Sequence, residues 1–441
     1  MAVENLKGMQ VSALEVENVA SARKFARGLV QESFFQEAIA LVAEQPTAYP
    51  RELVKKVASY GLTSIEIDNE YLPDNLKGAK MSPAEQAVVM EELARKHAGL
   101  ALSILVLNSL TAFELNKFGT EKQKVALLPK MATGELVACF GLTEPDVGSD
   151  AKNIQLKATP IEEGKFRIET GHKRFITGAN GADIMFLAAR TGSSESRGDG
   201  ITFFIVDMHD PGISVQQYSK AGQPGSPLCE VVFDNVILSS EHILGGPDNL
   251  NKGWPMIDAT LKHSRNWIAA QGVGLAQRVY DEAVKYGMTR MVHGKYLTDL
   301  PDHATALRVM DTQVDLSRRL VQLAAEKEMS GDKNFWVLSS LSKLIACDTA
   351  AWAALEAMQL HGGIGYTNEM EICKLWLDSP VLRIYEGTVP IQIKLVRSGG
   401  ITNGVIRGLL PPKLSESYVS EELDVVHPEL IEVALSQLQL K

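Results

Sequence analysis

The chain contains 441 residues, of which 45% are hydrophobic and 22% charged, and these proportions are typical of a globular protein long enough for two or three domains. Its formal net charge of −10 argues against binding to nucleic acid or to an anionic membrane surface, because both ligands are bound by protein surfaces with a local surplus of Lys and Arg. The cysteines Cys139, Cys229, Cys347 and Cys373 lie far apart without a CxxC pair, so neither a metal site nor a disulfide framework is expected.

The first twenty residues predict no targeting segment. They contain Glu4, Glu15 and Glu17 and lack both the apolar stretch of a signal peptide and the Arg-rich character of a transit peptide. The expected location is the cytoplasm. The longest apolar run, at 101–107, is far shorter than the roughly 20 residues that cross a bilayer, so it predicts a buried helix and no transmembrane segment.

Hydrophobic spacing changes twice along the chain. From Val11 to about Lys130 apolar residues recur every three or four positions, which indicates amphipathic helices, and Thr120 marks a helix start after Gly119. Between about Leu136 and Gly246 short segments rich in Val, Ile and Phe are divided by Gly, Pro, Asp and Asn, which predicts a β-domain. Helical spacing then returns. The predicted domains are 1–135 (helical), 136–247 (β), 248–400 (helical) and 401–441 (a tail).

The tail begins with Gly399-Gly400 and contains Pro411-Pro412, so it is predicted to be a linker. A last short helix is expected near 428–439. The simplest role for such a tail is an oligomer contact or a cover for the rest of the protein.

Two stretches in the β-domain could contact a ligand. ACFGLTEPDVGSD (138–150) is an apolar strand that leads into a polar turn, and such a turn exposes backbone N–H groups and hydroxyls. In HKRFITGANGAD (172–183), side-chain alternation puts Phe175 and Thr177 on one side of a strand. That pair could stack on a flat ring and donate to it. Taken singly, each stretch also describes an ordinary strand and turn.

A third stretch, RIYEGT (383–388), places the carboxylate of Glu386 before Gly387. Glycine has no side chain and lets a ligand approach the backbone closely. A solvated loop acid is the alternative interpretation of this stretch alone.

Together, these stretches, SRNWIAAQGVGLAQR with Arg290, and QLHGGIGYTNEMEICKLWLDSPVLRIYEGT resemble the acyl-CoA dehydrogenase family over about residues 10–400. The resemblance implies an α+β multidomain fold with an N-terminal helical domain, a central β-barrel domain and a C-terminal four-helix domain. It also implies FAD and an acyl-CoA thioester as ligands. The helical, strand and helical order read from periodicity agrees with this fold.

The resemblance implies a role for each matching residue. Glu386 matches the catalytic base. Matches to cofactor-binding positions are Phe140, Leu142, Thr143, Phe175, Thr177, Arg290, Gln359, Gly362, Gly363 and Thr388. Matches to substrate-binding positions are Ser149, Arg265, Tyr385 and Gly387. Arg290 corresponds to an arginine that reaches the FAD pyrophosphate of a neighbouring subunit, which implies a homodimer or homotetramer.

The chain departs from the family pattern at several positions. Phe175 stands where tryptophan is frequent, Asp146 where glycine is usual, and Lys262 where some members have aspartate. His293, the segment 301–303 and Pro390 alter the expected adenosine pocket. Ser264 occupies the position at which some members carry the base, and serine cannot act as a carboxylate, so Glu386 is the expected base.

The implied reaction removes a proton from carbon 2 of a fatty acyl-CoA and transfers a hydride from carbon 3 to N5 of FAD, which gives a trans-2-enoyl-CoA. The implied electron acceptor is an electron-transfer flavoprotein. Aliphatic residues at 102–106 slightly favour medium or long acyl chains. Two alternatives stay open: an acyl-CoA oxidase or flavin monooxygenase on the same fold, and a non-catalytic scaffold protein. HExxH, GxSxG and GxGxxG motifs are absent from the sequence.

Overall fold

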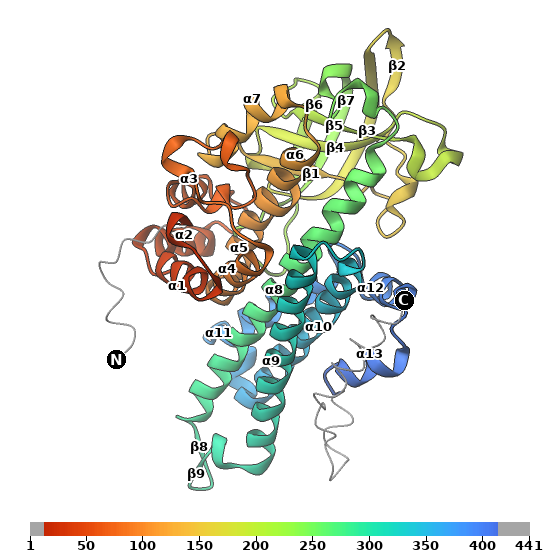
Figure 1. Ribbon diagram of the computed structural model, residues 1–441. Helices are drawn as coiled ribbons and strands as arrows, with labels where there is room; N and C mark the ends of the chain where they lie inside the picture. The colour runs from red at the N-terminus through yellow and green to blue at the C-terminus, as the bar shows by residue number, and fades with distance from the viewer. Residues whose placement is uncertain (1–12, 413–441) are drawn as a thin grey trace. The chain divides into compact units, whose positions relative to one another are not determined.

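The structure, a computed structural model, describes residues 13–412, and these divide into two compact units. The first unit holds the described residues up to Val89 together with Gly99–Ser264, and the second holds Met90–Ala98 with the residues from Arg265 onward. Helices come first, then strands, then helices again, as the hydrophobic spacing predicts (Figure 1). The predicted helix near 428–439 lies outside the described residues.

The N-terminal helices bury apolar residues, and the first turns of two of them, at Val19 and Glu121, are capped by side chains. Asn18 accepts from the backbone N–H groups of Ala20 and Ser21, and Thr120 with Gln123 forms a capping box. The predicted helix start after Gly119 is therefore confirmed. The helices are α1 (Val19–Leu29), α2 (Ser33–Glu44), α3 (Arg51–Ser59), α4 (Pro83–Lys96), α5 (Ala98–Leu105), α6 (Phe113–Phe118) and α7 (Glu121–Ala132).

The apolar run at 101–107 lies in a buried helix, as predicted. A π-helical segment, η6 (Val106–Ala112), joins α5 to α6, so Ala98–Phe118 is continuous. By length and composition this helix could cross a membrane, but 94% of its most apolar window is buried inside the protein, as in a core helix. Asn108, Ser109 and Thr111 donate back to carbonyls of the preceding turn, which gives these buried donors acceptors within the core.

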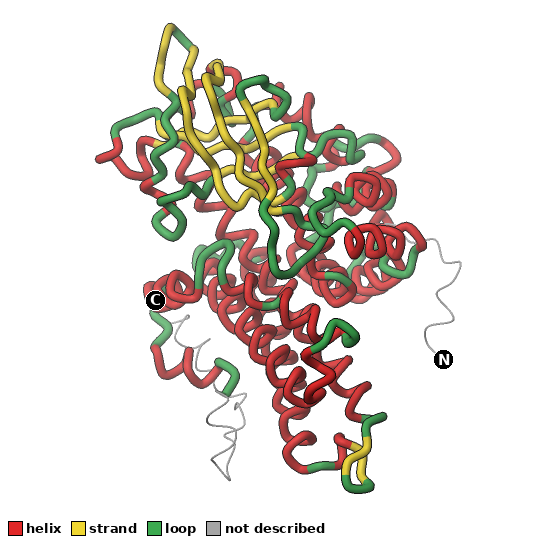
Figure 2. Tube along the Cα trace, turned by 180° about the vertical axis from the view of Figure 1, so that it is seen from behind, coloured by secondary structure: helices red, strands yellow, loops and turns green. Residues whose placement is uncertain are grey.

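The β-domain predicted between 136 and 247 consists of two sheets. One has the order β1-β4-β5, with β1 (Ala138–Gly141) parallel to β4 (Ile184–Arg190) and β4 antiparallel to β5 (Ile201–Asp207). The other is antiparallel with the order β2-β3-β7-β6, and the strands of the domain are drawn in yellow in Figure 2. Its strands are β2 (Thr159–Glu162), β3 (Lys165–Thr177), β6 (Ile213–Gln217) and β7 (Leu228–Ser239).

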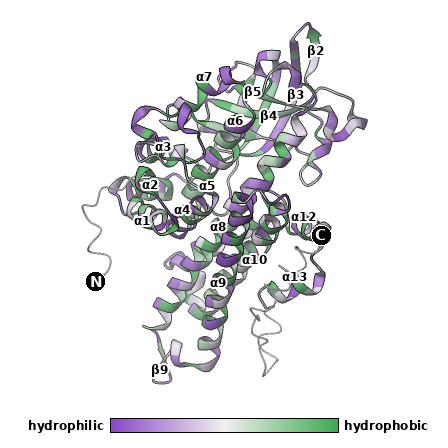
Figure 3. Ribbon diagram, viewed as in Figure 1, coloured by the Kyte–Doolittle hydropathy of each residue, from purple (hydrophilic) through white to green (hydrophobic). Residues whose placement is uncertain are grey.

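The two sheets share one apolar core. Met185 and Phe204 from the first sheet and Ile168 and Phe233 from the second are at most 1% exposed and belong to the same buried cluster. All residues of β4 are buried, as expected for a central strand covered on both faces, and the strand is mainly hydrophobic in Figure 3. This core fixes the ends of β1 and β3.

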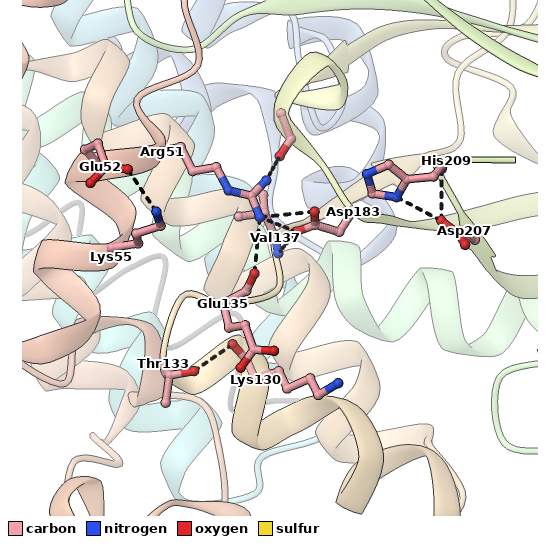
Figure 4. A network of polar contacts seen from close by, with 11 residues as sticks. Arg51, Glu52, Lys55, Lys130, Thr133, Glu135, Val137, Asp183, Asp207 and His209 are labelled. Atoms are coloured by element: carbon pink, nitrogen blue, oxygen red, sulfur yellow. Dashed lines mark hydrogen bonds and ion pairs between the residues drawn. The ribbon is translucent and has the colours of Figure 1, made fainter.

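A polar network ties the β-domain to α3 within the first unit. The Arg51 guanidinium donates to both carboxylate oxygens of Asp183 and to the carbonyl oxygens of Gly181 and Glu135 (Figure 4). Asp183 also accepts from the backbone N–H of Val137, 2.7 Å away, directly before β1. One carboxylate thus positions both the start of β1 and the start of β4.

The second unit is a helical bundle. Its main helices are α8 (Gly253–Gly287), which begins in the first unit, α9 (Pro301–Met329) and α10 (Phe335–His361), and they run side by side in Figure 1 and Figure 2. Shorter helices follow: α11 (Glu371–Asp378), α12 (Val389–Ser398) and α13 (Asn403–Leu409). The last turns of α4 join this unit through ion pairs from Glu91 to Arg318 (3.0 Å) and from Arg95 to Asp281 (2.6 Å).

The residues that depart from the family pattern fit the local backbone. His293 and Gly294 have φ values of +50° and +78°, which a two-residue turn between β8 (Met291–Val292) and β9 (Lys295–Tyr296) requires. Pro301 and Pro390 lie in the first turns of α9 and α12, where proline removes no helical hydrogen bond. These substitutions do not disturb the fold.

The tail differs from the prediction. Residues after Gly400 were expected to be a linker, but they form α13, whose Val405, Ile406 and Leu409 pack into a core with residues of α9, α10 and α12. Gly404, Gly408 and Pro411 weaken the helix signal in the sequence. Burial of the apolar face overrides that weak propensity.

Candidate functional site

The first group of predicted site residues lies where β1 ends. Phe140 is the third residue of β1, and Leu142 and Thr143 follow the strand directly. Leu142 is buried, whereas Phe140 and Thr143 are half-buried. The carbonyl of Thr143 accepts from the backbone N–H of Arg174 at 2.8 Å, so the polar turn is attached to the end of β3.

Phe175 is held in an unusual conformation at that end of β3. Its φ is +59°, a left-handed value that is an outlier for a bulky residue, and the β3–β7 register shifts between Lys173 and Ile176. The ring is 56% exposed and packs against Tyr218 with centroids 5.6 Å apart. Thr177 is half-buried, while Ile176 between them faces the core. The bulge presents an aromatic face and a hydroxyl on the surface of the first unit.

A buried ion pair fixes the turn against β3. Lys173 is fully buried, and its Nζ donates to the Glu144 carboxylate at 2.7 Å and to the Leu142 carbonyl at 2.9 Å. Glu144 also accepts from the backbone N–H groups of Gln155 and Leu156. Burial lowers the pKa of Lys173 to about 8, although Glu144 opposes this shift. The pair positions Thr143 and Phe175 relative to each other.

Ser149 lies on the exposed part of the same turn. Its neighbour Asp150 forms an ion pair of 2.7 Å with Arg197, and Glu144 and Val147 exchange backbone hydrogen bonds that close the turn. The turn therefore has a defined shape while the Ser149 hydroxyl faces outward.

The second group surrounds Glu386 in the second unit. Glu386 has a φ of +50° and Gly387 a φ of +102°, so two successive residues adopt left-handed backbone conformations. The Gly387 carbonyl accepts from Lys343 Nζ (2.7 Å) on α10 and from Gln392 Nε2 (2.9 Å) on α12, and the same amide donates to the Glu386 carbonyl at 3.1 Å. A Cβ on residue 387 would lie 2.5 Å from Gln392 Nε2, so glycine is required there.

Further contacts hold both sides of this loop. The Tyr385 hydroxyl donates to Gln271 Oε1 on α8 at 2.7 Å, and Gln271 in turn donates to the Ala98 carbonyl. Thr388 precedes the first residue of α12. Arg265, also on α8 and six residues before Gln271, is buried and acts electrostatically on Lys343, as Glu386 does. Arg265, Tyr385, Glu386, Gly387 and Thr388 therefore form one neighbourhood.

The third group lies elsewhere in the same unit. His361, at the end of α10, stacks on Tyr286 near the end of α8 with ring centroids 4.3 Å apart. Gly362 and Gly363 follow His361, and Arg290 follows Tyr286 by four residues. Along α8, Arg265 and Gly287 are separated by roughly 33 Å at the α-helical rise per residue. Arg290, Gln359, Gly362 and Gly363 are thus brought together, but away from Glu386.

The three groups fit the parts of a flavin dinucleotide. Phe175 offers an exposed aromatic face beside hydroxyls, which suits a flat heteroaromatic ring. Arg290 is exposed, and a guanidinium suits a pyrophosphate. A Cβ built on Gly362 or Gly363 meets nothing within 4 Å, so a ligand or a second chain has room to approach there. Within residues 13–412, no cluster of His, Cys, Asp or Glu could hold a metal ion. Together with the carboxylate of Glu386, these features are those expected of a flavin-dependent oxidoreductase.

Comparisons with known proteins identify the family. The acyl-CoA dehydrogenase N-terminal, middle and C-terminal domains match residues 17–135, 139–236 and 251–400. The chain is 34% identical to the 3-(aryl)acrylate reductase of Clostridium sporogenes, over 85% of this chain and 96% of that protein. It is 32% identical to CarC of the caffeyl-CoA reductase-Etf complex of Acetobacterium woodii, over 86% and 96%. Butyryl-CoA dehydrogenase from Megasphaera elsdenii matches with a TM-score of 0.80 and 30% identity, over 88% and 99%.

The chain therefore belongs to the acyl-CoA dehydrogenase family and is an FAD-dependent oxidoreductase. The predicted fold, with helical domains on either side of a β-domain in the sequence, is confirmed.

Sequence reasoning missed the residues that hold the site in place. Lys343 is the single charged residue in the first half of α10, at 335–347, and Gln392 and Gln271 stand among apolar residues of α12 and α8. A lone polar residue in an otherwise buried helical face was the available signal. Glu144 and Lys173 belong to quoted motifs, but their pairing across the turn depends on the bulge in β3.

We predict that Glu144→Ala destabilises the protein by about 3 kcal/mol or more, because it leaves the Lys173 ammonium and two backbone N–H groups without their acceptor. Lys173→Met should cost less, since Glu144 keeps its backbone donors. Urea unfolding measures both. Comparable losses, or a larger loss for Lys173→Met, would contradict this account.

The same lysine predicts a pH dependence. Its folded-state pKa of about 8 lies below the value of about 10.4 in an unfolded chain, so between these values the unfolded state binds more protons. Wild-type stability should therefore rise relative to Lys173→Met as pH increases from 8 to 10. The control Lys165→Met, in an exposed pair on β3, should show no such difference.

Proposed function

We propose that the enzyme dehydrogenates a fatty acyl-CoA between carbons 2 and 3, and that Glu386 is the base. The observation that carries this proposal is the backbone at Glu386 and Gly387, where two left-handed residues are held by donors from two helices. Strained conformations persist where the surrounding structure over-determines them, and they cluster at active sites. A general base needs such a fixed position, because proton transfer requires hydrogen-bond reach.

The chain's residues would divide the work as follows. The Glu386 carboxylate takes the proton from carbon 2, and its backbone N–H donates to the thioester oxygen on which charge builds. Ser149 and Arg265 hold the CoA arm, and Phe175 and Thr177 place the flavin. Bound FAD supplies a two-electron acceptor for the hydride that leaves carbon 3. The thioester loses a proton and a hydride, and the product is a trans-2-enoyl-CoA.

The aliphatic residues at 102–106, at the junction of α5 and η6, suit a straight aliphatic acyl chain. Leu102, Ile104 and Val106 are all buried and offer only hydrocarbon surface. A panel of acyl-CoA substrates of increasing length determines the preferred chain.

Reduction of an enoyl thioester is a second candidate direction. The observation that favours it is that two relatives, at 34% and 32% identity, are named as reductases. The same residues serve both directions, because a protonated Glu386 returns its proton to carbon 2 when the reaction runs backward. The rate of oxidation of butanoyl-CoA is compared with the rate of reduction of trans-2-butenoyl-CoA, and the faster reaction indicates the preferred direction.

We predict that Glu386→Gln retains FAD but loses at least ~10²-fold in the rate at which butanoyl-CoA bleaches the flavin. The amide has nearly the same shape but cannot accept the proton. Stopped-flow absorbance provides the measurement, and Glu369→Gln, an exposed acid on the approach to α11, is the matched control. A rate within a few-fold of wild type would place the base elsewhere.

The proposed electron acceptor is an electron-transfer flavoprotein, since one relative is a subunit of a complex named for such a protein. Turnover with an electron-transfer flavoprotein or a ferrocenium salt should exceed turnover with oxygen at least tenfold. Equal rates in air would favour the oxidase interpretation. Purified protein without flavin absorbance would instead favour a scaffold.

We also propose a homodimer or homotetramer in which Arg290 serves the FAD of a neighbouring subunit. The support is the separation along α8, because one dinucleotide cannot reach from Glu386 to Arg290 in the same chain. Arg290→Ala should release FAD more readily on dilution and lower the melting temperature, since a ligand bound only by the assembly stabilises it. Arg308→Ala, on exposed α9 surface, is the control. A fully flavinated monomer by light scattering would contradict the proposal.

A further inference from the structure

Lys343 is a buried cation that the proposed reaction leaves without a role. It lies in the middle of α10 with 1% of its surface exposed, and its Nζ donates to the Gly387 carbonyl at 2.7 Å. An ammonium buried with one neutral acceptor is costly, so a nearby negative charge is expected to compensate it. Burial lowers the pKa of Lys343, and Glu386 and Cys347 oppose that shift.

The charged surroundings of Lys343 point to a single acid. Among the described residues, the groups that act on the ammonium are the Cys347 thiol from the same helix, the Arg265 guanidinium from α8 and the Glu386 carboxylate from the loop. Asp348 is paired with Arg383 at 2.8 Å, so its charge is already balanced. From α12, only the neutral Gln392 amide reaches the same carbonyl. Glu386, next to the Gly387 carbonyl that Lys343 contacts, is thus a carboxylate that lies within the electrostatic reach of this cation.

Two donors on one carbonyl differ in what they supply. Gln392 provides hydrogen bonds to the carbonyls of Glu386 and Gly387 and no charge. Lys343 provides a hydrogen bond and a positive charge. Removing either donor loosens the left-handed turn, but only removal of Lys343 changes the electrostatic potential at the base.

We propose that Lys343 is a positioning residue that fixes the Glu386 loop through the Gly387 carbonyl and keeps the Glu386 carboxylate ionised through its charge. This inference rests on the proposed role of Glu386 as the base. The cation favours the charged form of the carboxylate, so its loss makes the carboxylate easier to protonate. The pH at which the rate of proton abstraction falls to half on the acidic side, here called the acid-side midpoint, then moves to a higher value.

The test measures proton abstraction alone. (Methylthio)acetyl-CoA has hydrogens on carbon 2 and sulfur in place of carbon 3, so it can exchange with solvent deuterium without losing a hydride. Exchange by the FAD-loaded enzyme is followed by NMR from pH 5 to 9. Lys343→Met should shift the acid-side midpoint upward by about one pH unit, at the low end of the effect of one nearby charge. Lys343→Gln, which can still donate, should shift it equally.

Matched variants separate charge from position. Gln392→Met removes two hydrogen bonds to the loop and no charge, so it should slow exchange at every pH and leave the midpoint in place. Lys343→Arg should keep the wild-type midpoint. Lys394→Met, an exposed lysine on α12, should change neither quantity.

The outcomes distinguish this inference from the proposed function. Exchange at the wild-type rate in Glu386→Gln overturns the base itself. Loss of exchange in Glu386→Gln, with a wild-type midpoint in Lys343→Met and Lys343→Gln, overturns only the role of Lys343. An equal midpoint shift in Gln392→Met also overturns it, because the shift then follows from loop position. If Lys343→Met does not fold, Lys343→Gln and Lys343→Arg still decide the question.

Discussion

The carbonyl of Gly387 is the acceptor on which the geometry of the candidate active site depends. Left-handed backbone at a non-glycine residue costs about 1–3 kcal/mol, so the conformation of Glu386 persists only if its surroundings exclude the alternatives. Lys343 and Gln392 meet that requirement from two helices, and Tyr385 is held by a third. The carboxylate is therefore placed by the packing of the bundle rather than by the loop itself.

The β-domain holds Phe175 in a similar way. Phe175 has a left-handed backbone at a strand bulge, and the buried pair of Lys173 and Glu144 ties the bulge to the polar turn after β1. In both units a buried lysine donates to a backbone carbonyl beside a strained residue. The chain carries a formal charge of −10, yet these cations lie inside it. Each of these two buried lysines thus helps to fix a loop.

Periodicity in the sequence was sufficient to predict the order of helical and β regions, because amphipathic spacing reflects burial directly. The start of α7 followed from Thr120, since capping is local. The local sequence did not predict α13, because the packing of Val405 and Ile406 outweighs the low helix propensity of nearby glycines. Nor did it predict the contacts of Lys343 and Gln392, whose partners are distant in sequence, so that only the packed bundle reveals them. The strained backbone at Glu386 and Phe175 likewise has no sequence signature beyond an adjacent glycine in the first case.

The separation of the site residues along α8 bears on how the enzyme can work. Arg265 lies near the Glu386 loop, whereas Arg290 lies beyond the far end of the helix, beside the glycines after α10. A rigid helix cannot bring these two arginines to one ligand. If both bind anionic groups, each chain takes part in two sites: it contributes the base to one and a phosphate contact to another. Under that arrangement the departure at His293 concerns the contact that a chain makes for its neighbour, whereas Pro390 lies in the first turn of α12, four residues after Glu386. The base and the phosphate contact are then carried by different parts of the same bundle.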